Sequence, residues 1–178
     1  MNRRWITVSM LITALAVPEA TSASPPVLRS GTRPFFATFG FGPALSVSNS
    51  LTQLKIEQSF GYHFSGNSAG PALGITLQES FGSQVFVFQP NARFWFDIPV
   101  SSDLGVYVTP TVGLGMAVVP VPNYGTLLAF DMQFGAEVRF VLGDRGVLFA
   151  RPLGLDINVN GNGTSIRYDL VFGGGGTF

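Results

Sequence analysis

The sequence predicts an all-β chain, folded as an eight-stranded antiparallel up-and-down β-barrel that spans a membrane. Apolar and polar residues alternate along most of the chain, which is the two-residue period of a strand. Charged residues make up 11% of the 178 residues, against roughly 25% in soluble domains. No apolar run reaches the roughly 20 residues of a transmembrane helix. A barrel with an apolar exterior accounts for all three observations.

The clearest alternation runs over residues 128–142. The apolar face carries Leu128, Phe130, Met132, Phe134, Ala136, Val138, Phe140 and Leu142. The other face carries Asp131, Gln133, Gly135, Glu137 and Arg139. A helix would scatter these charges around its circumference. Strands that cross a membrane run about 9 to 11 residues and set lipid-facing apolar side chains against a polar lumen, so this stretch is predicted to be one of them.

The first residues have the layout of a secretory signal peptide. Arg3 and Arg4 precede an apolar run over 5–17, and the small residues Thr21-Ser22-Ala23 follow it. We therefore expect a signal peptide over 1–23, a periplasmic lead-in over 24–32 and the barrel over 33–178. The alternative is an uncleaved anchor. The chain has no Cys, so neither a lipidation site nor a disulfide framework is expected.

The first strand is expected over 33–47, where Phe residues lie on both faces and two Gly and Pro43 blur the alternation. Residues 48–50 (Ser-Asn-Ser) have the composition of a turn. The second strand is expected over 51–64 and alternates cleanly. Its apolar face carries Leu54, Ile56, Phe60, Tyr62 and Phe64, and its other face carries Lys55, Glu57, Ser59, Gly61 and His63.

The third strand is expected over 71–80, where Glu79 falls in the apolar phase and indicates that the strand has already left the bilayer. The fourth strand is expected over 85–97. It sets Phe86, Phe88, Ala92, Phe94 and Phe96 outward, with Gln89, Asn91, Arg93 and Asp97 inward. A short turn is expected over 99–103.

The fifth strand is expected over 104–118, with valines outward and Tyr107 inward, and a Pro-rich loop over 120–125 leads to the strand over 128–142. The seventh strand, over 147–159, is the least regular. Phe149, Leu153 and Leu155 are expected to point outward, but Arg151 intrudes in their phase. An Asn-Gly turn then leads to the last strand, over 164–178.

The predicted inward face collects ten charged residues. They are Lys55, Glu57, Arg93, Asp97, Asp131, Glu137, Arg139, Asp156, Arg167 and Asp169. Eight strands leave an interior only wide enough for side chains, and an unpaired buried charge costs several kcal/mol. We therefore expect these residues to pair in a polar lumen that is plugged. The alternative is a path for ions or solutes.

The last strand ends on an aromatic residue preceded by apolar residues at every second position. They are Tyr168, Leu170, Phe172 and Phe178. With the signal peptide and the eight alternating strands, this ending resembles the small outer-membrane barrels of Gram-negative bacteria, the OmpA/OmpX-like group. The resemblance implies outer-membrane residence, contact with outer-membrane lipid, and recognition of these four residues by the barrel-assembly machinery. It also implies periplasmic chaperones as partners. Gly174 and Gly176 depart from the pattern, because larger apolar residues are usual there.

The expected role is non-enzymatic: a structural or surface-contact role in the envelope. Zero net charge gives no reason to expect nucleic acid, and no soluble substrate, cofactor or metal is indicated. One alternative is an enzyme, since His63-Phe64-Ser65 with Glu79 is similar to the site of outer-membrane lipid A deacylases. Another is a secreted soluble barrel that binds an apolar ligand, which requires the apolar face to point inward.

One further motif has a simpler explanation than ligand binding. Asp156-x-Asn158-x-Asn160-Gly161 copies the start of a calcium loop, but Arg167 stands at the twelfth position where a bidentate Glu is needed. The end of a strand followed by an Asn-Gly turn accounts for the same residues.

Overall fold

The computed structural model describes residues 33–47, 51–67, 69–82, 85–101, 104–121, 125–143 and 145–178. The expected signal peptide and lead-in lie outside the described residues. The described part of the chain contains no helix long and apolar enough to cross a membrane. Its strands are β1 (Phe35–Ser46), β2 (Thr52–His63), β3 (Pro71–Gly82), β4 (Val85–Phe96), β5 (Ile98–Ser101), β6 (Val106–Val121), β7 (Gly125–Leu142), β8 (Gly146–Asn160) and β9 (Gly163–Thr177).

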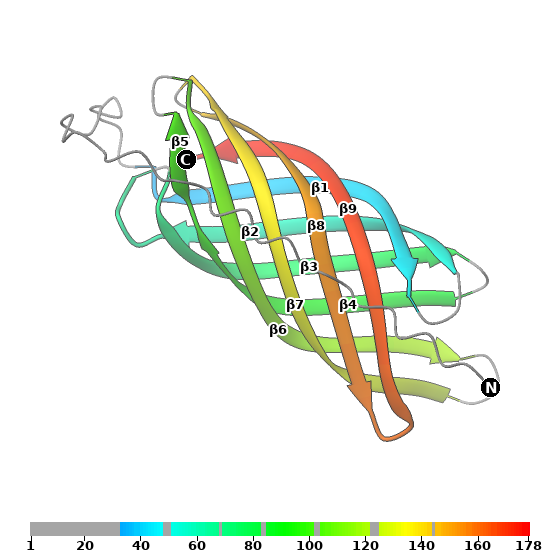
Figure 1. Cartoon of the computed structure of the whole chain (residues 1–178). Helices are drawn as coiled ribbons and strands as arrows, with labels where there is room; N and C mark the ends of the chain where they lie inside the picture. The colour runs from blue at the N-terminus through cyan, green and yellow to red at the C-terminus, as the bar shows by residue number, and fades with distance from the viewer. Residues whose placement is uncertain are drawn as a thin grey trace, which may run out of the picture.

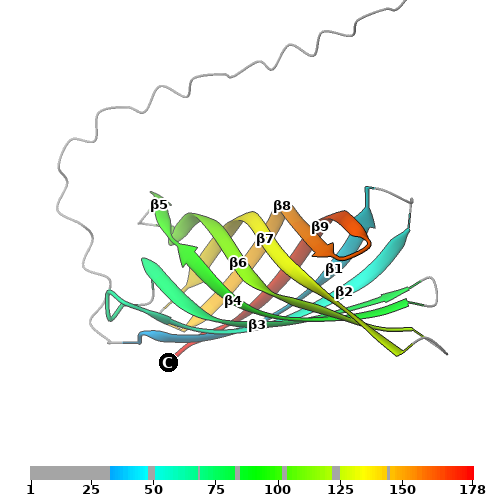
Figure 2. The ribbon, with the colours of Figure 1, turned by 90° about the horizontal axis from the view of Figure 1, so that it is seen from below.

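The strands form one closed antiparallel barrel, and Figures 1 and 2 show them wrapping around a common interior. Neighbours in the chain are neighbours in the sheet, and the pairing of β1 with β9 closes it. Both β4 and β5 pair with β6, so these two make one bent wall strand and the barrel has eight. The predicted all-β, eight-stranded antiparallel barrel is confirmed.

Two predicted connections are shorter than expected. A turn was predicted over 99–103, but Ile98 to Ser101 continue the wall as β5, where Pro99 still pairs with Tyr107 and the register shifts only after it. Likewise Pro120 and Val121 belong to β6 and Gly125 begins β7, so much of the predicted Pro-rich loop is strand. Both changes lengthen the wall.

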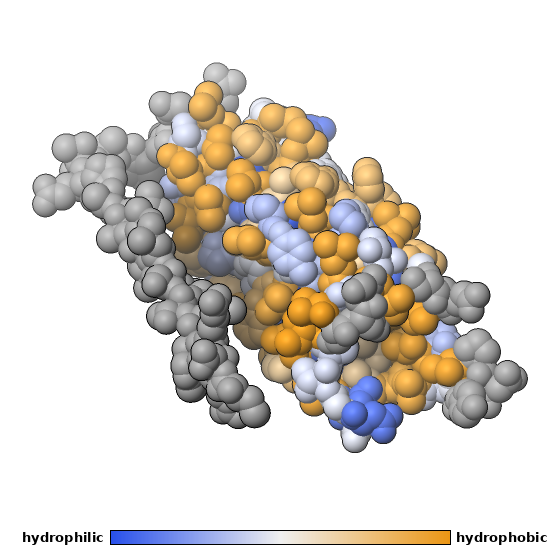
Figure 3. Space-filling model, turned by 45° about the vertical axis from the view of Figure 1, so that its right-hand side comes forward, coloured by the Kyte–Doolittle hydropathy of each residue, from blue (hydrophilic) through white to orange (hydrophobic). Residues whose placement is uncertain are grey.

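The orientation of the two faces follows the alternation. On β7, Phe130 and Phe134 are 50% and 45% exposed, whereas Asp131 and Gln133 are 0% and 3% exposed. Apolar side chains of the same phase cover the outside of the other strands, as the space-filling view in Figure 3 shows for one side. This is the opposite of what a soluble barrel with an apolar ligand inside requires.

The interior is layered from one end to the other. At the end where β1 begins and β9 finishes (the terminal end), Phe36, Ala72 and Trp95 form a buried apolar cluster. A second apolar cluster near the opposite end contains Val87, Ala117 and Ala129. The charged side chains occupy the length between and around these clusters. Apolar clusters and charged side chains thus share the interior along the length of the barrel.

Candidate functional site

The centre of the polar interior is a set of ion pairs around Glu57 on β2. Glu57 accepts hydrogen bonds from Arg93 Nη1 at 2.6 Å and from Arg151 Nη1 at 3.2 Å. Arg151 also lies 3.4 Å from a carboxylate oxygen of both Glu137 and Asp169. All five residues are 4% exposed or less. One guanidinium thus neutralises acids from three different strands.

A second set of ion pairs joins β2 to β8 and β9. Lys55 Nζ donates to Asp156 Oδ2 at 2.8 Å and also to Asp169. Arg167 donates to the same Asp156 oxygen at 3.1 Å and to Gln53 at 3.0 Å. Because Asp169 contacts both Lys55 and Arg151, this set is continuous with the one around Glu57.

The third set lies at the terminal end and is built on Asp97. Its Oδ1 accepts hydrogen bonds from Arg139 Nη1 at 3.0 Å and Thr109 Oγ1 at 2.6 Å. Its Oδ2 lies 3.1 Å from His63 Nε2. The Arg139 guanidinium also lies 5.1 Å from the ring centroid of Phe36, within cation–π range. This set brings charged and aromatic side chains together at the terminal end.

Asp131 differs from the other interior acids. Its Oδ2 accepts hydrogen bonds from three amides, those of Gln89, Asn91 and Gln133, at 2.7 to 3.0 Å. Its Oδ1 has no hydrogen-bond partner in the described part of the chain. Five buried bases face six buried acids there, and Asp131 is the acid that no base contacts.

The structure places all ten residues of the predicted polar lumen in the interior and brings them into these contacts. Each is 7% exposed or less. Parity along each strand was sufficient to find them, because inward and outward positions alternate.

The alternation did not predict that Arg151 lies in the interior, and it placed Phe149 on the wrong face for the same reason. Phe149 was expected to point outward but is 5% exposed, in the same inward phase as Arg151. A register shift between Arg151 and Gly154 inserts an extra residue into β8, so Leu153 returns to the outside. Pro152 was the available signal, since proline inside a sheet favours a bulge.

The residues of the hydrolase alternative are not brought together. His63 faces Asp97 and the carbonyl of Pro34, whereas the Ser65 hydroxyl donates to Ala69 O at 2.7 Å within its own turn. Glu79 lies on the outward face near the opposite end of the barrel, on a strand that continues to Gly82. No described contact joins Ser65 to His63 or Glu79 to either.

The residues of the calcium-like motif separate in the same way. Asp156 pairs with Lys55 and Arg167, and Asn160 accepts a hydrogen bond from the Asn162 N–H in the turn. Among the described residues, no three His, Asp or Glu side chains are arranged to hold a metal ion.

The four residues predicted as an assembly signal follow the outward phase of β9 and the C-terminus. Phe172 and Phe178 are well exposed, and the Phe178 ring stacks on Phe35 of β1. The backbones of Phe35 and Phe178 exchange hydrogen bonds at 2.9 and 3.2 Å. The glycine run over 173–176 lets β9 approach β1, because a Cβ on Gly175 would lie 2.0 Å from the carbonyl oxygen of Ala37.

No protein-family description and no curated protein matches the chain. Several solved structures share its fold. Neisserial surface protein A has a TM-score of 0.60 and 15% identity, covering 83% of this chain and 98% of its own. The N-terminal β-barrel domain of Pseudomonas aeruginosa OprF has a TM-score of 0.55 and 16% identity, covering 82% and 98%. The outer membrane enzyme PagL has a TM-score of 0.54 and 14% identity, covering 78% and 97%.

These neighbours are small eight-stranded barrels of the bacterial outer membrane, and one of them is an enzyme. At such low identity they establish the fold and not the activity. The resemblance inferred from the alternating strands is confirmed: the chain has the closed eight-stranded barrel fold of small outer-membrane proteins.

Proposed function

We propose that this chain is an integral protein of the bacterial outer membrane, with a structural or surface-contact role and no catalysis. The observation that carries the proposal is the division of the faces: large apolar side chains are exposed around the barrel, while its charges are buried and paired. An apolar exterior of this extent is unfavourable in water. Unpaired backbone N–H and C=O groups are unfavourable in hydrocarbon, and closure of the sheet pairs them.

The plugged lumen is part of the proposal. It is supported by the continuous ion pairs from Lys55 to Glu137 and by the apolar clusters at both ends. The cavity among Arg93, Gln133 and Arg151 has a volume of about 10 Å³, which is about one water molecule. A side-chain network this dense stiffens the wall and leaves no route for a solute.

Membrane fractionation followed by gel electrophoresis tests the placement. The protein is expected in the outer-membrane fraction, and the unboiled sample is expected to migrate differently from the boiled one, because closed barrels resist detergent until heated. A folded product that stays soluble without detergent would contradict the proposal. Conductance measurements in planar bilayers test the plugged lumen. The protein should give no stable conductance, and steady channels would contradict the plug without contradicting the outer-membrane placement.

The exported start of the chain is tested separately. We propose cleavage after Ala23, so the intact mass of the mature protein should correspond to a chain that begins at Ser24.

We also propose that the assembly machinery recognises Tyr168, Leu170, Phe172 and Phe178. Deletion of Phe178 should lower the amount of folded barrel in cells while leaving refolding of the purified chain in detergent possible.

Absence of catalysis is proposed because Ser65 is bonded within its own turn, away from His63. Lipid A from cells that produce the wild-type chain should have the same mass spectrum as lipid A from cells that produce Ser65→Ala. Loss of an acyl chain that depends on Ser65 would overturn this part of the proposal.

A further inference from the structure

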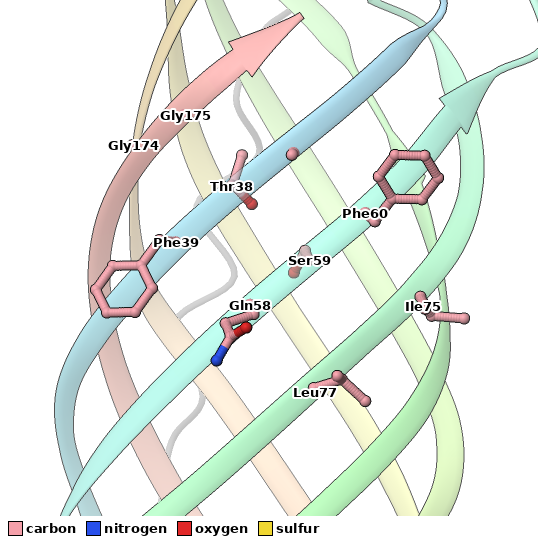
Figure 4. Close-up of a pocket in the computed structure, with 10 residues that line it drawn as sticks. Thr38, Phe39, Gln58, Ser59, Phe60, Ile75, Leu77, Gly174 and Gly175 are labelled. Carbon is pink, nitrogen blue, oxygen red and sulfur yellow. The ribbon is translucent and has the colours of Figure 1, made fainter.

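A groove of about 420 Å³ lies on the outer wall where β9, β1, β2 and β3 run side by side (Figure 4). Small outward residues, Ala37 and Gly174, leave this space between larger side chains. Phe39, Phe60 and Leu77 border it. The groove therefore arises from the glycine run that departs from the usual C-terminal pattern.

The groove contains one polar outward side chain, that of Gln58. It is exposed, its cross-strand neighbours are Phe39 and Leu77, and within the described residues its amide makes no hydrogen bond. Gln58 stands near the middle of β2, which puts it about 13 to 15 Å from each rim of the wall at ~3.3 Å per residue and a tilt of ~40°. A carboxamide at the centre of a bilayer needs a partner, since hydrocarbon offers none.

Building on the outer-membrane placement proposed above, we propose that this groove is a self-association face. A second copy of the chain docks on it by a two-fold axis along the membrane normal, and the two Gln58 amides hydrogen-bond to each other. Such an axis brings residues of equal depth together and makes the interface self-complementary. An amide both donates and accepts, so each Gln58 side chain can donate one hydrogen bond to the other and accept one from it.

Lipid alone satisfies this site less well than a second copy. An acyl chain can fill the apolar groove but carries no hydrogen-bonding group at mid-depth, and the headgroups lie at the rims. Small residues let two membrane segments approach closely, and Gln side chains are known to link such segments. The groove next to Phe39 and Phe60 supplies both a depression and projecting rings to fill the depression of the other copy.

Disulfide crosslinking in membranes tests the contact, because the chain contains no native Cys. Gln58→Cys should give a disulfide-linked dimer under mild oxidation. The matched control is Leu114→Cys, an exposed position on β6 away from the groove, which should stay monomeric. Both variants are first checked for heat-dependent gel migration, so a failure of the barrel assignment appears at that step. If both variants pass the check and Gln58→Cys crosslinks no better than Leu114→Cys, the proposal is overturned.

Energy transfer between labelled copies in lipid vesicles measures the strength of association as lipid is added. Gln58→Leu should weaken dimerisation about tenfold, the scale of one hydrogen bond within a membrane. Ala37→Phe, which fills the groove, should abolish it, whereas Ala92→Phe on β4 should not. Unchanged association in both groove variants, or co-purified lipid that Ala37→Phe displaces without any dimer present, would mean that the groove is not a self-association face.

Discussion

The inward and outward faces of the same strands are specified in different ways. On β7, inward Asp131 and Arg139 each contact named partners on other strands through directed hydrogen bonds. Outward Phe130 and Phe134 are about half exposed and need only an apolar surrounding. An inward residue therefore depends on particular partner side chains, whereas an outward residue depends only on being apolar.

The largest effect is expected where one inward residue has the most partners. Arg151→Leu removes the cation that Glu57, Glu137 and Asp169 share. Leaving buried charge uncompensated should lower the free energy of unfolding by about 3 to 5 kcal/mol. Urea unfolding of the refolded barrel in lipid vesicles, followed by tryptophan fluorescence, measures this change.

Arg145→Leu is the matched control, because Arg145 is an exposed arginine in the turn before β8. It should change the unfolding free energy by less than about 0.5 kcal/mol. If both variants lose the same small amount, the inner network contributes no more than the surface does.

The interior position of Arg151 is also one that the sequence pattern did not predict. The alternation of apolar and polar residues predicted the strands and the face of nearly every residue. An error in where a strand ends does not change which residues share a face. The alternation failed at Phe149 and Arg151, where the bulge in β8 shifts the phase by one residue. Parity also gives a face but no height or direction across the lumen. Sequence alone therefore does not show that Lys55 of β2 meets Asp156 and Asp169 of β8 and β9.

The next largest effect tests the outer face. Phe134→Arg places a charge on the outward side near the middle of β7, where the side chain is 45% exposed. A lipid-facing arginine at mid-bilayer should cost about 2 to 4 kcal/mol in vesicles. Phe134→Leu should cost far less, since polarity is kept. An arginine variant as stable as the leucine variant would indicate that this face does not meet hydrocarbon.

A smaller loss is expected at the terminal end. Asp97→Asn keeps the shape of the side chain but removes the charge that Arg139 and His63 face. Hydrogen bonds to a charged group contribute about 1.5 to 3 kcal/mol, so the unfolding free energy should fall by roughly that amount. Arg139→Leu combined with Asp97→Asn should lose less than the two single changes added together, because the buried guanidinium is no longer left alone. Full additivity would show that the two residues do not interact.

The smallest effect, and the one of opposite sign, is expected at Asp131. Asp131→Asn makes the same chemical change as Asp97→Asn, but no base in the described part of the chain contacts this acid, and three amides donate to its Oδ2. The asparagine keeps an oxygen for those donors, and its cross-strand neighbour Asn158 has an Oδ1 that lacks a hydrogen-bond partner among the described residues. Removing an uncompensated buried charge should leave stability unchanged or raise it by up to about 1 kcal/mol. A loss as large as that of Asp97→Asn would show that the charge of Asp131 stabilises the barrel although only amides donate to its Oδ2.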